Sequence, residues 1–171
     1  DGVPRSKIRP GATIEVIPNN IIDNCNSTRG AENYLEELFG SECFSYPKPY
    51  ELMQKLLSYM DLTDATVLDF FSGSATTAEG VFRNNVLNGS NTKFIMIQLP
   101  ENLDDSLVSA SSFSRPIIQN AINYLEKQNK PHNICEIGKE RIRLCAAKIR
   151  EEFGEKTNNI DFGFRNFYVS K

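Results

Sequence analysis

The sequence predicts an α/β fold in which a parallel sheet carries flanking helices. Two apolar runs of strand length, 65–71 and 92–99, enclose a segment of helical periodicity, so that residues 67–99 form a β-α-β unit. Crossovers of this kind are right-handed and join parallel strands. The 171 residues fit one domain, or one domain with an appendage, because domains have roughly 100–200 residues.

The composition is that of an ordinary folded protein. Hydrophobic residues make up 40% and charged residues 24% of the chain, which excludes a disordered tail. The 19 Lys and Arg against 22 Asp and Glu give a net charge of −3, so any contact with nucleic acid would have to be local. Four cysteines without a C-x-x-C pair and a single histidine predict no metal site and a reducing, cytoplasmic location. No apolar run is long enough to cross a membrane.

The first part of the chain divides into an arm and a helix. Residues 1–28 carry three prolines and one short apolar alternation at Ala12–Ile17, so we expect an extended linker arm with at most one strand. The remaining residues, 29–171, form the domain proper. Apolar residues at helical spacing predict a helix over 31–39, which Gly40 ends.

The central elements follow in the order helix, strand, helix, strand. Pro49 marks the start of a helix with one apolar stripe. The run 65–71 is short, mostly apolar and partly β-branched, and it predicts a buried strand of the kind that parallel sheets cover on both faces. Helical periodicity from Ala78 to Gly89 follows it, and the second strand, 92–99, ends at Pro100.

The last third of the sequence is mainly helical. Residues 101–115, rich in Ser and Asp, predict a loop, and Pro116 opens a helix with an inward apolar stripe. The 3.6-residue pattern of 138–153 is the strongest helix signal in the sequence, and Gly154 ends it. Alternation over 162–169 predicts a final strand.

The turn between the first strand and its helix carries the candidate site. A helix N-terminus at the carboxyl edge of a parallel sheet offers free N–H groups, and ligands of open α/β folds bind there. The small residues 72–75 let a ligand approach the backbone. The turn lacks a P-loop signature, and Ala75 stands where the dinucleotide pattern G-x-G-x-x-G has its second glycine. It therefore suits a nucleoside bearing a carboxylate, although a tight connection without any ligand remains an alternative.

These residues also resemble a known family. Asp69-Phe70-Phe71-Ser72-Gly73-Ser74-Ala75-Thr76-Thr77 is similar to the methionine-loop motif D-F-F-x-G-S-G-T-T of S-adenosylmethionine-dependent DNA amino-methyltransferases. Segments 46–52, 93–101, 137–143 and 161–165 resemble the Y-P-K-P-x-x-L, K-F-I-x-x-Q-L-P-E, I-G-K-E-R-I-R and D-x-G-F-R segments of one subgroup. That subgroup is the modification subunit of type III restriction–modification systems, which are adenine-N6 methyltransferases of the beta group. The five motifs cover roughly residues 26–171.

The resemblance implies a Rossmann-like methyltransferase half that binds S-adenosyl-L-methionine. Lys48 and Pro49 would belong to a segment that closes over the cofactor, although an ordinary helix start is the alternative. The other implied cofactor-binding residues are Asp69, Phe70, Phe71, Gly73, Ser74, Thr76 and Thr77. Ala75 departs from the motif's glycine, and if that position has a positive φ the alanine costs stability or moves the loop.

Two further groups of side chains bear on the site. Gln98 ends the second strand, where a Rossmann-like site expects an acid for the ribose hydroxyls, and its amide can make such a bond. Glu101 is the alternative. The five cations of the last long helix predict a solvated face, with phosphate contact as the alternative; they are Lys139, Arg141, Arg143, Lys148 and Arg150.

One expected motif is missing. Amino-methyltransferases hold the flipped adenine with a loop of the D-P-P-Y type, whereas this sequence has no two adjacent prolines. In the subgroup that it resembles, this loop and the DNA-recognition region precede the Y-P-K-P segment. We therefore expect no catalytic residue here. The chain, which begins without Met, is interpreted as the C-terminal, cofactor-binding fragment of a larger enzyme and as inactive alone. That parent would meet DNA through its upstream region, a restriction subunit and a second copy of itself.

Two other function classes stay open. The chain could be a non-catalytic interaction module that pairs with the missing half or with another subunit, because a truncated sheet leaves an edge exposed. A small-molecule methyltransferase or a nicotinamide-binding domain is disfavoured by the missing G-x-G-x-x-G and the short chain.

Overall fold

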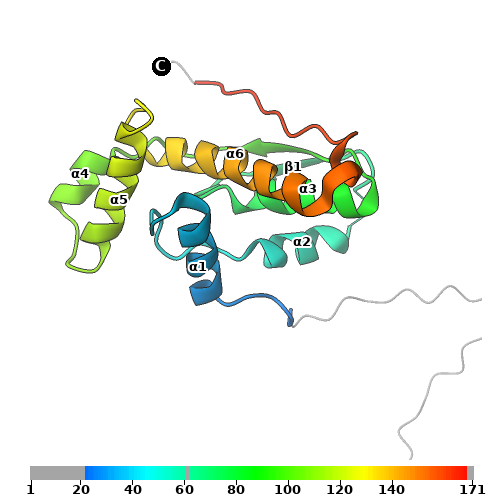
Figure 1. The fold of residues 1–171 in the computed structure, drawn as a ribbon, viewed down its shortest axis with the longest axis horizontal. Coiled ribbons are helices and arrows are strands. Elements are labelled where there is room, and N and C mark those ends of the chain that lie inside the picture. The colour runs from blue at the N-terminus through cyan, green and yellow to red at the C-terminus, as the bar shows by residue number, and fades with distance from the viewer. Residues whose placement is uncertain (1–21, 61, 169–171) are drawn as a thin grey trace, which may run out of the picture.

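A computed structural model describes residues 22–60 and 62–168 (Figure 1). In these residues the long helix α6 runs along the molecule, with α4 and α5 at one end and the sheet with α3 toward the other. The elements are α1 Thr28–Phe39, α2 Tyr50–Ser58, β1 Thr66–Asp69, α3 Thr76–Asn88, β2 Lys93–Met96, α4 Leu103–Val108, α5 Ser114–Glu126, α6 Ile134–Phe153 and the 3₁₀ turn η1 Gly154–Thr157.

The predicted β-α-β unit is present. Strands β1 and β2 pair in parallel, with Thr66 opposite Lys93 and Asp69 opposite Met96. Helix α3 connects them and packs on the sheet, where the rings of Phe82 and Phe94 lie 5.4 Å apart. The described residues thus confirm the α/β class and the parallel strands, although each strand is shorter than its apolar run.

The two faces of the sheet differ in exposure. Phe94 and Met96 pack against the core between α3 and α6. On the opposite face Leu68 is 47% and Ile95 51% exposed. The prediction that the strand in 65–71 is buried on both faces is therefore wrong for the described residues. The helices in this part of the chain cover one face of the sheet and leave Leu68 and Ile95 on the other face half exposed.

Two apolar clusters share helix α6. The first lies between α3, α6 and the tail, where Phe82, Ile149 and Phe162 are buried. The second joins α1, α5 and the beginning of α6 around Leu35 and Leu125. Because α6 contributes to both clusters, it connects the α4–α5 end of the molecule with the sheet.

Local capping explains where the helices begin and end. Gly40 and Gly89, with φ of +77° and +63°, end α1 and α3 as predicted. The Asn133 side chain accepts from the Glu136 N–H, so α6 begins four residues earlier than the predicted 138.

One predicted loop contains a helix. The Asn102 side chain accepts hydrogen bonds from the backbone N–H groups of Asp104 and Asp105, at 2.8 and 3.3 Å. This cap starts the short α4 inside the predicted loop 101–115.

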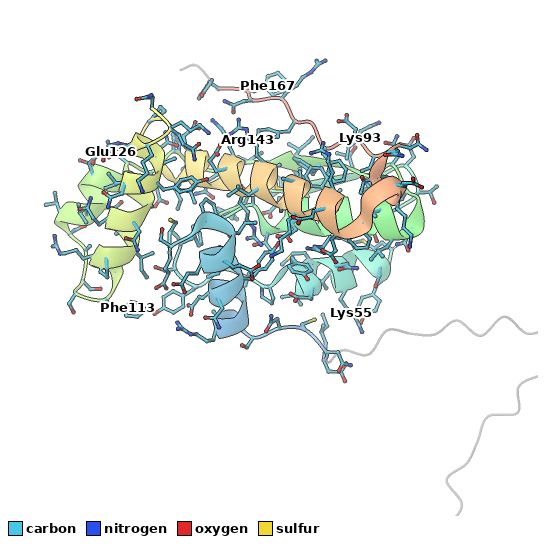
Figure 2. The ribbon with its side chains drawn as sticks, in the orientation of Figure 1. Lys55, Lys93, Phe113, Glu126, Arg143 and Phe167 are labelled. Carbon is cyan, nitrogen blue, oxygen red and sulfur yellow. The ribbon has the colours of Figure 1, made fainter. Side chains whose placement is uncertain are left out.

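The predicted final strand is absent from the described part of its range, 162–168. These residues instead run back along α6 as an extended tail (Figure 1). Figure 2 shows Phe167 of the tail and Arg143 of α6 on the same side of the molecule. Phe162 is buried, Arg143 lies 5.2 Å from the Phe164 ring, and Lys139 lies 5.4 Å from the Tyr168 ring. The alternating pattern of 162–168 therefore reflects contacts of its aromatic side chains with α6, and not pairing with a strand.

Some predictions fall elsewhere. The predicted strand Ala12–Ile17 and most of the arm 1–28 lie outside the described residues, and the division at 28/29 stays a prediction. No helix in the described ranges is long and apolar enough to cross a membrane. All four cysteines are free, and no cluster of metal-ligating side chains occurs in the part of the chain that the structure describes.

Candidate functional site

The Asp69–Thr77 loop leaves β1 at its carboxyl end and is fastened to the chain beyond β2. The Ser72 N–H donates to the Ile97 carbonyl at 3.2 Å, and the Ala75 N–H donates to the Ser72 carbonyl at 2.6 Å. Gly73 has a φ of +48°, and a Cβ built there would lie 3.4 Å from Cζ of Phe44. Glycine is thus favoured at this position by its conformation and by the nearby ring.

Asp69 connects the end of the strand to the first turn of α3. Its Oδ1 accepts from the Phe71 N–H at 3.1 Å, and its Oδ2 accepts from the Thr77 hydroxyl at 2.6 Å. A carboxylate near a helix N-terminus also interacts favourably with the helix dipole. Asp69 and Thr77 are therefore brought together, and each stabilises the loop.

Gln98 also holds the loop. Its Oε1 accepts from the Gly73 N–H at 2.9 Å, a contact that sequence reasoning missed. The Gln98 carbonyl in turn accepts from the Cys135 thiol, 3.4 Å away at the beginning of α6. The ribose role of Gln98 stays a prediction, since its amide oxygen is already shared with the loop.

Ala75 occupies the left-handed region, with φ of +60° and ψ of +36°. The sequence predicts a cost at Ala75 if its φ is positive, and it is positive. A residue with a Cβ loses roughly 1–2 kcal/mol of stability in this conformation. Helix α6 approaches closely here, because a Cβ on Gly138 would lie 3.2 Å from the Gly73 carbonyl oxygen. Sequence reasoning placed Gly138 only at a helix start and missed this contact.

Arg141 is buried against the same loop. One guanidinium nitrogen, Nη1, donates to the hydroxyls of Ser74 and Thr76 at 2.8 and 2.6 Å. The side chain is 1% exposed. The expectation that it belongs to a solvated basic face is therefore wrong, because α6 turns this position toward α3.

Glu79 is the buried acid that pairs with Arg141. Its Oε2 accepts from Nη2 of Arg141 at 3.0 Å, and its Oε1 accepts from Nε of Arg83 at 3.2 Å and from the Tyr34 hydroxyl at 2.6 Å. Burial and the Glu79 carboxylate raise the pKa of Tyr34 above its ordinary value. The i, i+4 spacing of Glu79 and Arg83 could have predicted one of these pairs, but no local signal connects either residue to Tyr34 or Arg141.

Lys48 and Pro49 lie beside the loop, and their closing over a cofactor stays a prediction. The Lys48 carbonyl accepts from the Thr76 hydroxyl at 3.3 Å, while the lysine side chain is exposed and Pro49 is buried. Both residues line a hollow of about 130 Å³ shared with Tyr34 and Tyr50. This hollow is small beside the roughly 300–1,000 Å³ of typical ligand pockets.

The two aromatic residues of the loop point outward. Phe70 is 61% and Phe71 91% exposed, and Leu99, after β2, is 74% exposed. Ser74, Thr76 and Thr77 are buried and bonded within the protein. The loop therefore presents two aromatic rings to solvent and keeps the hydroxyls of Ser74, Thr76 and Thr77 inside.

Comparison with known proteins decides the family. The family model N6_N4_Mtase, described as DNA methylase, matches residues 13–103. This range is more than half of the 171 residues and contains the whole Asp69–Thr77 loop. The chain belongs to the DNA methylase family.

Relatives of this DNA methylase chain confirm the resemblance to type III modification subunits. The type III restriction-modification enzyme StyLTI Mod subunit of Salmonella typhimurium is 32% identical over 148 residues, 86% of this chain and 20% of the relative. The EcoPI Mod subunit of Escherichia phage P1 is 41% identical over 75 residues, 44% of this chain and 12% of the relative. The type II methyltransferase M.KpnI of Klebsiella pneumoniae is 31% identical over 103 residues, 60% of this chain and 25% of the relative. The chain thus spans a quarter or less of the length of these relatives.

Proposed function

We propose that this chain is the S-adenosylmethionine-binding part of a DNA adenine-N6 methyltransferase of the type III modification-subunit kind. The observation that carries the proposal is the Asp69–Thr77 loop, which joins a parallel strand to a helix N-terminus in a chain of the DNA methylase family. The first N–H groups of such a helix have no partner within the helix, so they can donate hydrogen bonds to a carboxylate.

The loop residues fit the methionine part of the cofactor. The methionine part would lie against the half-buried Ser72 and Gly73, with its carboxylate toward the N-terminus of α3, and the exposed rings of Phe70 and Phe71 would provide an apolar wall. We assign Asp69 and the inward hydroxyls of Ser74, Thr76 and Thr77 to holding the shape of this backbone. When bound, S-adenosylmethionine supplies a methyl group on a sulfonium centre.

The remaining predicted residues would complete the site from two sides. Lys48 and Pro49 lie next to Thr76 and would close over the cofactor. Gln98 would offer its remaining hydrogen-bonding capacity to the ribose while its Oε1 holds Gly73. The sheet would continue into a Rossmann-like fold with parts of the parent protein that this chain does not contain.

The parent enzyme would transfer the methyl group to adenine N6 in DNA. We assign the adenine pocket and the sequence recognition to regions outside this chain, and we propose DNA, a restriction subunit and a second copy of the parent as partners. Methyl transfer of this kind depends on the positioning of two reactants, so this chain alone should be inactive. Incorporation of methyl groups into DNA by the isolated chain would contradict that assignment.

Isothermal titration calorimetry with S-adenosylmethionine and S-adenosylhomocysteine tests the site. We expect the chain to bind both and the Gly73→Asp variant to bind neither, because a carboxylate would stand where the cofactor's carboxylate approaches. Gly89→Asp is the matched control, since Gly89 also has a positive φ but lies at the other end of α3 with no atom near an added Cβ. Equal loss of binding in both variants would argue against a cofactor at the loop.

The uncovered sheet face favours a second candidate, an interaction module. Leu68, Ile95 and Ile97 are each about half exposed on this face, and parallel sheets usually have both faces covered. Sedimentation that shows mass rising with concentration, without cofactor binding, would support this candidate. A monomer that binds S-adenosylmethionine would contradict it.

A further inference from the structure

We propose that Arg141 is a positioning residue that gives the Asp69–Thr77 loop its cofactor-binding shape. Arg141 belongs to α6, far from the loop in the sequence, and touches it only through Ser74 and Thr76. The inference deepens the proposed function, since the loop's role in binding S-adenosylmethionine rests on that proposal.

The contacts of Arg141 join the loop to the body of the molecule. Nη1 donates to the Ser74 and Thr76 hydroxyls, and also lies 3.4 Å from the Ser74 carbonyl. Nη2 donates to Glu79, one turn into α3. The two nitrogens of one planar group therefore fix the loop relative to the helix that follows it, which a lysine with a single ammonium could not do.

The position of this cation is unfavourable for helix stability alone. It lies at the N-terminal end of α3, where the helix dipole is positive and an acid would be preferred. Its buried Nε has no hydrogen-bond partner among the described residues.

The arrangement also holds the loop's strained residue in its conformation. Ala75 lies between the two residues that Arg141 holds and has a φ of +60°. A residue with a Cβ keeps this conformation only when its surroundings fix it. Arg141 on one side and Gln98, through Gly73, on the other supply such a restraint.

Arg83 provides a matched control for Arg141. Both arginines pair with Glu79 and both are 5% exposed or less, so replacing either one leaves Glu79 with one guanidinium. Among the described residues Arg83 interacts with Glu79, Glu152, Tyr34 and the Tyr50 ring, none of which belongs to the loop. Arg141→Gln and Arg83→Gln therefore differ in whether the loop loses a contact.

The test measures amide hydrogen exchange of the loop, urea unfolding and calorimetric affinity for S-adenosylmethionine on the full 171-residue chain and both variants. We expect comparable losses of stability. Exchange at 73–76 should rise at least tenfold, and affinity fall at least tenfold, only in Arg141→Gln. Arg141→Lys should recover stability more than loop protection, because it keeps the charge without the fork.

The outcomes separate this inference from the proposed function. Unchanged loop exchange in Arg141→Gln, equal loosening by Arg83→Gln, or full recovery by Arg141→Lys would overturn the positioning role. If the unaltered chain does not bind S-adenosylmethionine, the proposed function fails while the exchange comparison still decides the role of Arg141. If Arg141→Gln does not fold, Ser74→Ala removes the contact from the loop side, with Ser90→Ala as its control; faster exchange at 73–76 in Ser74→Ala alone is required.

Discussion

The two ends of α3 are both stabilised by buried polar side chains, but in different ways. At the N-terminal end they surround a buried charge and are far apart in sequence: the Glu79 carboxylate bonds to Tyr34 and Arg141. At the C-terminal end they are neutral and local: Asn85 bonds to Ser90 and Thr92, five and seven residues away. The C-terminal bonds close one turn, whereas the N-terminal bonds connect three helices.

This difference separates an end held mainly by local contacts from one held by distant contacts. The side-chain bonds of Asn84, Asn85 and Ser90 after α3 stay between residues 84 and 92. This turn meets the rest of the chain through the Asn91 N–H and the Thr92 hydroxyl, which donate to the carbonyls of Thr63 and Leu62. The loop before α3 depends on helices that come earlier and later in the chain. A loop held from outside can keep a strained shape that its own sequence would not favour.

The largest effect should come from removing the acid of the charged end. Glu79→Gln leaves the guanidinium groups of Arg141 and Arg83 without their buried carboxylate, so the free energy of unfolding should fall by about 3–5 kcal/mol in urea denaturation. Glu152→Gln removes a half-exposed partner of Arg83 and should cost no more than about 1 kcal/mol. Similar losses in the two variants would show that burial of the pair does not matter.

The neutral end should respond less. Asn85→Ala removes three hydrogen bonds to Ser90 and Thr92 and leaves the buried Thr92 N–H without a side-chain acceptor. We expect a loss of about 1–3 kcal/mol in the same urea measurement, with loop exchange at 73–76 unchanged. Asn88→Ala, at an exposed position of the same turn, removes one hydrogen bond, to Asn84, and serves as a control that should cost less than Asn85→Ala. A loss that also loosened the loop would mean that the two ends are not independent.

The sharpest comparison uses the left-handed residue at each end. Gly89→Ala places a Cβ in open space, so it measures the conformational cost alone and should lower the free energy of unfolding by about 1–2 kcal/mol. Ala75→Gly relieves the same cost but removes a buried methyl group worth about 0.8 kcal/mol, so it should gain no more than about 1 kcal/mol. Destabilisation by Ala75→Gly would show that packing, not backbone strain, decides this position.

The smallest effect concerns alkaline pH. The unfolded chain releases the Tyr34 proton near the ordinary pKa of 10.0, while the folded protein holds it to higher pH because burial and Glu79 raise the pKa. Unfolding is then coupled to proton release, so the stability contributed below that pH is lost as pH rises. Between about pH 9 and 11, the free energy of unfolding should fall less steeply with rising pH for Tyr34→Phe than for the unaltered chain. Tyr59→Phe, at an exposed position, should keep the original slope.

The sequence allowed the local features of this molecule to be predicted. The β-α-β unit, the glycine ends of α1 and α3, and the family of the Asp69–Thr77 loop all depend on residues close together in the chain. What could not be predicted depends on distant contacts. The role of Arg141 inside the core, the bond from Gln98 to Gly73 and the aromatic tail along α6 appear only when α6 lies against the sheet and loop.

The position of Gly138 against the Gly73 carbonyl has a consequence for protein engineering. Transplanting residues 69–77 into another β-α-β scaffold would carry over the motif without the surface that gives it its shape. A useful graft would also need the α6 segment with Gly138 and Arg141, aligned so that the helix backbone meets the loop backbone. The smallest transferable unit of this site is therefore a pair of segments separated by about sixty residues of sequence.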